Sequence, residues 1–142
     1  MHIIPVTDNN YQQAVDLITE NNLLTSDLTH TTLLYALYND KQLVGTVGLE
    51  VFGSEGLLRS LCVDNQVRKG GYGQLLVNHA EAEAKQKGVK VLYLLTVTAV
   101  AFFANRGYQT IDRNAVPESI QQSQQFTTTC SKTATLMKKA LV

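Results

Sequence analysis

The sequence SLCVDNQVRKGGYG, residues 60–73, connects an apolar segment to a turn that holds three glycines. The apolar segment is the end of a predicted strand, residues 56–63. Residues 71–87 carry apolar side chains at helical spacing and predict an amphipathic helix. The start of a helix presents backbone N–H groups without an intrahelical partner, and here Arg68 and Lys69 add positive charge. This arrangement predicts an anion site of the phosphate-cradle type.

Two well-known phosphate-binding motifs do not fit this turn. No Gly-Lys-Ser/Thr follows a first glycine after four residues, so the turn is not a P-loop. The Gly-x-Gly-x-x-Gly spacing of a dinucleotide fingerprint is missing as well. From its residues alone, the stretch leaves two interpretations open: a phosphate cradle, or a loop that only turns the chain.

The composition limits the class of protein. A length of 142 residues predicts a single domain, residues 1–142. Twelve basic residues balance twelve acidic ones, which argues against nucleic acid or an anionic membrane as a partner. The apolar runs stop short of the ~20 residues of a membrane span, and the first residues lack the pattern of a signal peptide. We therefore expect a cytoplasmic protein.

Cys62 and Cys130 show no metal-ligand spacing, so we expect no metal site and two reduced thiols. The sequence leaves the oligomeric state open, with a homodimer as one arrangement.

Strands and helices alternate along the predicted order of elements. Strands are expected at residues 2–6, 33–39, 42–52, 56–63, 89–97, 108–111 and 133–141, and helices at residues 7–21 (capped by Thr7), 71–87, 98–107 and from Pro117 onward. This order predicts an α/β fold in which one mixed, mostly antiparallel sheet is flanked by helices.

The order of these segments resembles the GNAT superfamily of acyl-CoA-dependent N-acetyltransferases. The resemblance rests on Arg68-x-x-Gly71-x-Gly73, on the strand before it and on AFFANRGY at 101–108, and it covers essentially the whole chain. Within the superfamily the chain looks most like the small N-acetyltransferases linked to arsenic-resistance operons. LLTVTAVAFFANRGY, residues 94–108, also looks like the acetyltransferase domain of N-acetylglutamate synthases. The resemblance implies a single-domain GNAT fold.

The resemblance also implies acetyl-CoA as co-substrate, with the glycine turn binding its pyrophosphate. The cofactor-binding residues that it implies are Arg68, the amides of Lys69, Gly70, Gly71, Tyr72 and Gly73, and the backbone of Leu61, Cys62 and Val63 along the pantetheine arm, where the fourth strand splays from the fifth. Asn105 is either a further cofactor contact or a solvated helix residue. The amide of Val63 has an implied catalytic role, because it would polarise the thioester carbonyl.

One position departs from the family pattern. Phe103 occupies the place of the tyrosine that usually protonates the departing thiolate. A positioned acid is worth roughly 10²–10⁴ in rate, so its loss need not abolish catalysis. The proton can come from the amine adduct, from water, or from Tyr93 or Tyr108, although both tyrosines are also interpreted as packed aromatic residues.

A carboxylate and a guanidinium are predicted to meet on neighbouring strands. Alternation along residues 42–52 places Glu50 on the face opposite Leu43. A tight turn over Gly53–Gly56 puts Glu50 directly across from Arg59. Two interpretations stay open: a structural ion pair, or an acceptor site in which Arg59 binds a substrate carboxylate and Glu50 acts as base through water.

Thr96 and Thr98 are candidates for hydrogen bonds to the acceptor, or for caps of the helix that follows them. The function that the resemblance implies is direct transfer of an acetyl group from acetyl-CoA to a primary amine of a small, amino-acid-like molecule. Two alternatives are a protein N-acetyltransferase and a catalytically weak module that binds or senses acyl-CoA.

Overall fold

The computed structural model describes residues 2–21, 23, 25, 28, 32–64, 70–112, 117, 120 and 134–141. Its elements in chain order are β1 (His2–Pro5), α1 (Tyr11–Glu20), β2 (Leu33–Asn39), β3 (Gln42–Phe52), β4 (Glu55–Val63), α2 (Tyr72–Gln86), β5 (Val91–Thr96), α3 (Val100–Ala104), β6 (Gln109–Thr110) and β7 (Thr135–Ala140). Arg68, Lys69, Cys130 and most of the helix expected after Pro117 lie outside the described residues.

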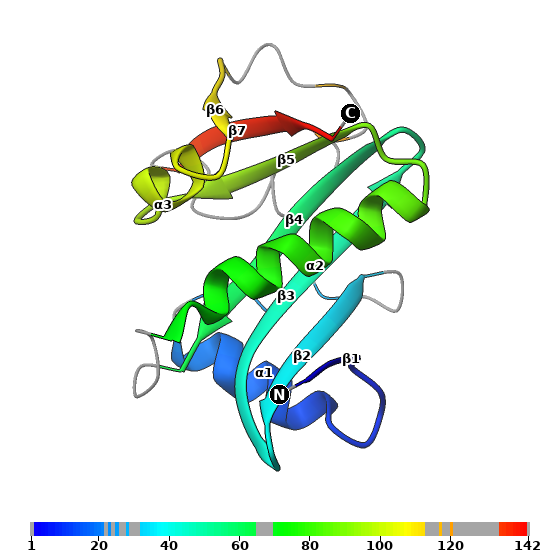
Figure 1. Ribbon diagram of the computed structural model, residues 1–142, viewed down its shortest axis with the longest axis vertical. Coiled ribbons are helices and arrows are strands. Elements are labelled where there is room, and N and C mark those ends of the chain that lie inside the picture. The colour runs from blue at the N-terminus through cyan, green and yellow to red at the C-terminus, as the bar shows by residue number, and fades with distance from the viewer. Residues whose placement is uncertain are drawn as a thin grey trace. The chain divides into compact units, whose positions relative to one another are not determined.

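The strands of the described chain form one seven-stranded sheet in the order β1-β2-β3-β4-β5-β7-β6 (Figure 1). The pairs β1–β2, β2–β3, β5–β7 and β6–β7 are antiparallel, whereas β4 and β5 run parallel. The predicted fold class, a mixed and mostly antiparallel sheet flanked by helices, is therefore confirmed. Among the described residues, no helix is long and apolar enough to cross a membrane.

The chain divides into two compact units that share β4. Unit 1 comprises Met1–Glu50 and Leu58–Glu83, and unit 2 comprises Val51–Leu57 and Ala84–Val142. Within unit 2, the first residues of β4 pair with β5 from Glu55/Val91 to Leu57/Tyr93. The rest of β4 belongs to unit 1. One domain over residues 1–142 stays a prediction.

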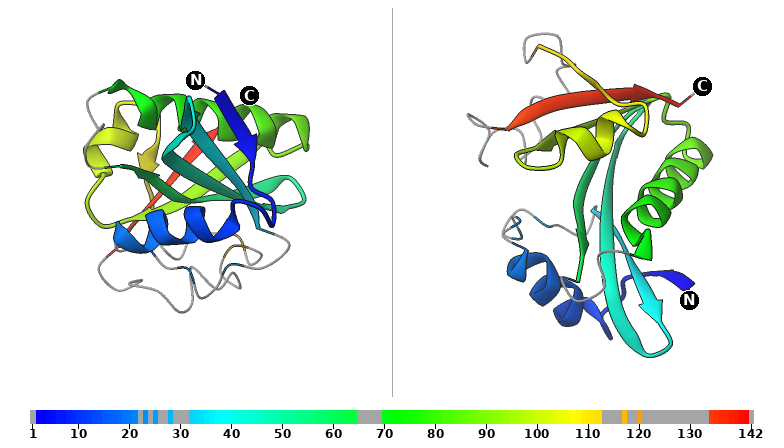
Figure 2. Two further views of the ribbon diagram at one scale, coloured as in Figure 1. Left: turned by 90° about the horizontal axis from the view of Figure 1, so that it is seen from below. Right: turned by 60° about the vertical axis from the view of Figure 1, so that its left-hand side comes forward.

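In unit 1, α1 and α2 cover opposite faces of the sheet, as both views of Figure 2 and Figure 1 show. On the α1 face, Leu17 and Ile18 pack against Leu34 and Cys62. On the α2 face, His79 meets the ring of Tyr35 edge-on, with ring centroids 4.7 Å apart. Successive side chains of a strand point to opposite faces, which explains why Leu34 and Tyr35 serve different helices.

Helix α1 starts three residues later than a cap at Thr7 predicts. The N–H of Thr7 donates to Asn10 Oδ1 at 2.7 Å, and the N–H of Asn10 donates to the Thr7 carbonyl at 3.2 Å. These two bonds close a turn over residues 7–10, so Asn10 is the N-cap and Tyr11 the first helical residue. The predicted cap at Thr7 is therefore wrong, and the Asn10 side chain, which accepts from Thr7, makes no capping bond to the helix.

Two strands of unit 1 are irregular. In the pairing of β2 with β3, Leu37 lies opposite Gly45 and the next residue, Tyr38, lies opposite Leu43. Val44 therefore has no partner on β2. The extra residue is a β-bulge, and it turns Leu43 towards the α1 face, where it packs on the cluster around Cys62. The simple alternation that placed Leu43 on the other face is therefore wrong. In β4, Ser60 adopts a left-handed φ of 55°.

Unit 2 has its own apolar cluster. Leu57, Tyr93, Ile120 and Leu136 form it. β5 is central here, because it pairs with β4 on one side and with β7 on the other. The successive residues Leu92, Tyr93 and Leu94 are all buried, so both faces of the strand are covered, which explains the nearly continuous apolar run VLYLLT. The predicted strand 89–97 is thus confirmed but two residues shorter at its start and one at its end.

Close packing of α2 on β3 depends on Gly45. A Cβ built on Gly45 would lie 2.8 Å from Leu76 Cδ1 and 2.9 Å from the Cys62 carbonyl oxygen. The second contact is with backbone, which cannot rotate away.

We therefore expect Gly45→Ala to lower the free energy of unfolding by about 1–3 kcal/mol, as overpacking does. The sign is diagnostic, because Gly→Ala at a site with room stabilises by about 0.4–1 kcal/mol through the unfolded chain. Urea unfolding of both proteins measures the difference, and a higher midpoint for the variant would contradict the packing described here.

Candidate active site

The glycine turn opens helix α2 in unit 1. Gly71 has φ = +74°, a left-handed conformation that glycine adopts without strain. The N–H of Leu75 donates to the Gly71 carbonyl at 3.3 Å. The amides just before Leu75 therefore belong to the first turn, where N–H groups have no acceptor within the helix. These amides, at the positive end of the helix dipole, suit a phosphate.

Gly70 adds a second constraint on the turn. A Cβ on Gly70 would lie 2.6 Å from Cε2 of Tyr72, because the phenol ring lies directly against the glycine. Gly71, by contrast, has no atom within 4 Å of the position of a Cβ. The first glycine thus allows the close approach of a ring, and the second allows the positive φ. Both features fit a backbone that wraps around an anion, and so the residues present fit the pyrophosphate of an acyl-CoA.

The end of β4 leads towards this turn within unit 1. Leu61 and Val63 are half-buried, whereas Cys62 is buried and is not part of a disulfide. After Val63, the N–H of Asp64 donates to the Val44 carbonyl at 2.8 Å. The segment predicted to contact pantetheine is therefore bounded by the left-handed Ser60 on one side and a bond to β3 on the other.

The predicted meeting of Glu50 and Arg59 occurs, with a different register. Arg59 Nη1 lies 3.2 Å from Glu50 Oε2, and the side chains are 1% and 14% exposed. Gly48, however, is the residue next to Arg59 across the strands: a Cβ there would lie 3.0 Å from Arg59 Cγ. The turn is Gly53–Ser54 instead of Gly53–Gly56, because β4 already begins at Glu55. The ion pair is therefore diagonal, and the arginine stem crosses a residue that has no side chain.

Two hydroxyl residues that the sequence did not indicate, Thr32 and Ser60, hydrogen-bond to this ion pair. Thr32 Oγ1 donates to the same Glu50 Oε2 at 3.0 Å, and Arg59 Nε donates to Ser60 Oγ at 3.2 Å. A buried guanidinium needs hydrogen-bond partners as well as a counter-charge. An arginine inside an apolar strand therefore predicts polar residues around it, but the sequence does not identify them.

In unit 2, Phe103 lies inside an aromatic cluster. It is 4% exposed and meets Phe102 and Tyr108 edge-on, with centroids 5.1 and 5.4 Å away. Tyr108 is 3% exposed, and Tyr93 belongs to the apolar cluster of unit 2. Burial, followed by the charge of Glu55, raises the pKa of Tyr93 above its ordinary value. A phenol with a raised pKa gives up its proton less readily, so its surroundings favour the packed interpretation.

The threonines predicted near the acceptor differ in their surroundings. Thr96 Oγ1 accepts a hydrogen bond from the N–H of Ala99 at 3.1 Å, just before α3. Thr98 is exposed. The bond closes a turn ahead of α3 but does not cap it, because Ala99 is the N-cap and no side chain caps the helix.

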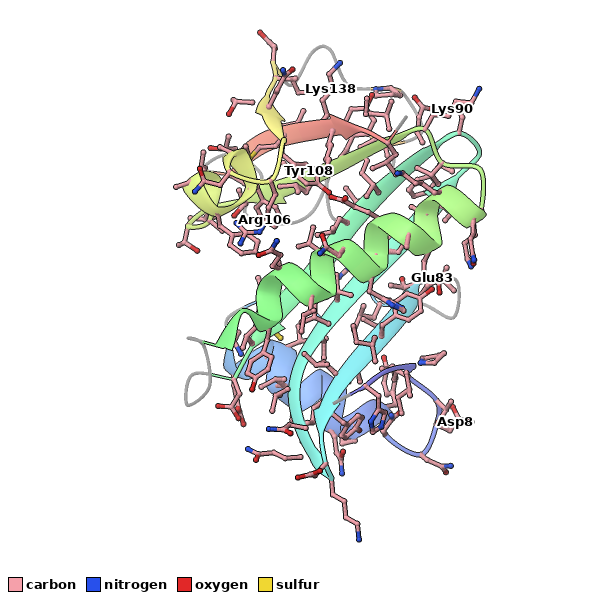
Figure 3. All side chains as sticks on the ribbon, viewed as in Figure 1. Asp8, Glu83, Lys90, Arg106, Tyr108 and Lys138 are labelled. Atoms are coloured by element: carbon pink, nitrogen blue, oxygen red, sulfur yellow. The ribbon has the colours of Figure 1, made fainter. Side chains whose placement is uncertain are left out.

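Asn105 is exposed at the C-terminus of α3. The next residue, Arg106, stacks on Phe102 with its guanidinium carbon 3.7 Å from the ring centroid, and it donates to the Phe102 carbonyl at 2.9 Å. Arg106 and Tyr108 both lie beside α3 (Figure 3). These contacts hold Arg106 against Phe102, the middle residue of the five-residue helix.

The geometry above agrees with what the chain matches among known proteins. Residues 30–110, more than half of the chain, match the acetyltransferase (GNAT) domain family. The chain belongs to this family.

Over 92 residues this GNAT domain is 32% identical to an amino-acid acetyltransferase of Neisseria meningitidis serogroup A, a match that covers 63% of this chain and 21% of that protein. The chain thus spans about one fifth of the length of the curated amino-acid acetyltransferases that it matches.

Solved structures share the fold of this GNAT domain. N-acetylglutamate synthase from Neisseria gonorrhoeae, complexed with coenzyme A and N-acetyl-glutamate, aligns with a TM-score of 0.84 at 22% identity over 99% of this chain and 35% of that one. A GNAT-family acetyltransferase from Staphylococcus aureus Mu50 aligns with a TM-score of 0.78 at 18% identity over 99% of both chains. At these identities the likeness establishes the fold.

Within the GNAT domain, the Glu50–Arg59 pair makes a testable contribution to stability. Glu50→Gln removes the counter-charge of a guanidinium that is 1% exposed. Breaking a fully buried pair costs about 3–5 kcal/mol, and we expect about 2–3 kcal/mol here because Glu50 is partly exposed.

Thr32→Val is the matched control, because it removes one neutral donor to the same carboxylate and should cost about 1 kcal/mol. Urea unfolding at pH 7 measures both variants. An equal loss for the two would show that the charge of Glu50 contributes nothing beyond its hydrogen bond.

Proposed function

We propose that this GNAT domain transfers an acetyl group from acetyl-CoA to a primary amine of a small, amino-acid-like acceptor. The observation that carries the proposal is the left-handed Gly71 at the start of α2, in a chain of the GNAT family. The amine nitrogen attacks the thioester carbonyl carbon, the C–S bond breaks, and the thiol of CoA leaves. The amine loses one proton and the sulfur gains one.

The cofactor side of the proposal uses the backbone of unit 1. The amides of residues 69–73 bind the pyrophosphate, with the side chains of Arg68 and Lys69 supplying charge. The backbone of Leu61–Val63 binds pantetheine, and the Val63 amide polarises the carbonyl at which negative charge develops. Asn105 is a further proposed contact of CoA. The solved relatives with coenzyme A in their complexes support acetyl-CoA as the co-substrate.

The acceptor side rests on the diagonal ion pair. Glu50, with 14% of its side chain exposed, is the proposed base and takes the amine proton through a water molecule. Arg59 is the proposed anchor of a substrate carboxylate, with Thr96 and Thr98 as further contacts. Because the Arg59 side chain is 1% exposed and contacts Glu50 through Nη1, a substrate carboxylate in this proposal shares the guanidinium with Glu50.

The class of acceptor is proposed from the relatives. Several curated relatives are amino-acid acetyltransferases, and one solved relative was complexed with N-acetyl-glutamate. The finer resemblance to arsenic-operon enzymes adds amino acids that bear arsenic or phosphorus to the acceptors worth testing.

One observation favours a second candidate, a catalytically weak acyl-CoA-binding module. Phe103 occupies the position of the usual acid, and it is buried among other rings without a hydroxyl of its own.

Thiol release distinguishes the two candidates. The assay uses acetyl-CoA with a panel of amino acids, including arsenic- and phosphorus-bearing ones, simple amines without a carboxylate, and short peptides. Turnover on amino acids is expected. Tight CoA binding without release on any amine would favour the module, and release only with peptides would favour a protein acetyltransferase.

The cradle is tested with two glycines of equal backbone geometry. Gly71 and Gly88 have φ of +74° and +85°, and neither has an atom within 4 Å of the position of a Cβ. Gly71→Ala and Gly88→Ala should therefore lower stability by similar amounts, about 1 kcal/mol.

CoA affinity by calorimetry should fall about tenfold or more in Gly71→Ala only, because the altered turn misplaces amides that bind phosphate. An equal CoA affinity in the two variants would contradict the cradle.

The carboxylate anchor is tested with Arg59→Lys, which keeps the charge but loses the planar fork. If Arg59 binds the substrate carboxylate, KM should rise about tenfold or more for an amino acid and much less for an amine without a carboxylate. If the arginine serves only the structure, both acceptors should respond alike. Steady-state kinetics on the two acceptors, with CoA affinity as control, separates these outcomes.

A further inference from the structure

A buried contact between β3 and β4 has no part in the transfer described above. Ser60 is 6% exposed and has φ = 55° in the middle of a strand. A non-glycine residue rarely adopts this conformation, and it persists only where the surroundings hold it in place. Ser60 directly precedes Leu61–Val63, the backbone proposed to contact the pantetheine arm and the thioester.

Thr46 on β3 binds the backbone of Ser60 through a hydrogen bond. It is 0% exposed, and its Oγ1 donates to the Ser60 carbonyl at 2.9 Å. Cys62 Sγ lies 3.0 Å from the same Oγ1. A hydroxyl has one proton to donate, and Thr46 gives it to Ser60, so the thiol of Cys62 is the donor in the second contact. The result is a chain of bonds from Cys62 through Thr46 to the carbonyl of the left-handed residue.

Two further bonds fix the ends of the segment. Arg59 Nε donates to Ser60 Oγ at 3.2 Å, and this bond holds the side chain of Ser60. Beyond Val63, the Asp64 N–H donates to the Val44 carbonyl at 2.8 Å, where β3 has its own bulge. Leu61–Val63 is thus held to β3 at both ends.

We propose that Thr46 is a positioning residue for acetyl transfer. By binding the Ser60 carbonyl, its hydroxyl fixes the direction in which β4 leaves the irregular residue, and with it the backbone of Leu61–Val63. The inference rests on the proposed function, in which this backbone contacts the reacting thioester. Thr46 itself contacts neither substrate, so it acts through Ser60. Its importance follows from the sensitivity of catalysis to displacements of about 1 Å.

The test compares Thr46→Val, which is nearly isosteric but has no hydroxyl, with Thr46→Ser, which keeps the hydroxyl. Well below the melting temperature, Thr46→Val should lower kcat roughly 10–100-fold. CoA affinity should fall much less than kcat, because the amides of the glycine turn still bind the pyrophosphate and only the contacts of the pantetheine arm shift, and Thr46→Ser should retain most of the activity. A folded Thr46→Val with kcat within about twofold of the parent, or an equal loss in Thr46→Ser, overturns the proposal.

Variants of Ser60 keep the proposal testable even if Thr46→Val does not fold. Ser60→Gly accepts positive φ freely and keeps the carbonyl that Thr46 binds, but it loses the hydroxyl. Ser60→Thr keeps a hydroxyl but is β-branched, which disfavours positive φ. The proposal expects higher kcat in Ser60→Gly than in Ser60→Thr. The reverse order would mean that the hydroxyl matters and the backbone does not, which overturns it.

Failure of the proposed function gives a different result from failure of this inference. If the parent protein releases no thiol with any amine, the proposed function fails. Amide hydrogen exchange then still tests the positioning: exchange at Leu61–Val63 should accelerate in Thr46→Val and stay near the parent rate in Thr46→Ser. Unchanged exchange in Thr46→Val overturns the positioning role, whatever the activity.

Discussion

The buried guanidinium of Arg59 is the constraint around which unit 1 is organised. A charge that is 1% exposed is tolerated only with a counter-charge and hydrogen-bond acceptors. Glu50 provides the first and Ser60 Oγ one of the second. The arginine stem fits because Gly48, its neighbour across the strands, has no side chain. Sequence features that look unrelated, a glycine, a glutamate and a serine on two strands, are thus requirements of one buried charge.

Strands β3 and β4 are irregular and yet remain closely packed. Gly45 on β3 lets Leu76 of α2 come close on one face, and Gly48 gives room to Arg59. Between them, Thr46 binds the carbonyl of Ser60. Bulges change the direction of a strand and are typical of the surroundings of active sites. Here the irregular residue stands directly before the segment proposed to contact the thioester, so the strain lies where a fixed backbone is useful.

In the proposed transfer, the leaving thiolate needs a proton, and the aromatic residues of unit 2 were the candidates to donate it. Phe103 has no hydroxyl and is enclosed by aromatic rings, while burial raises the pKa of Tyr93. These groups stabilise the apolar packing of the unit. The thiol of CoA is a tolerable leaving group that can be protonated from the amine adduct or from water. In the proposed transfer, Phe103 stands where an acid is usual, so we expect the rate to depend mainly on positioning and on electrostatic stabilisation of the carbonyl.

The sequence by itself predicted the order of the described strands and helices along the chain and the glycine turn, because period-2 and period-3.6 patterns and positive-φ glycines are local properties. It predicted β2 and β3 to the residue. Only the tertiary structure decided the diagonal register of Glu50 and Arg59, the skipped Val44 and the left-handed Ser60. These features are locally unfavourable and exist because contacts between strands hold them, such as the bond from Thr46. A pattern read along one strand contains no information about the residue that will lie across from it.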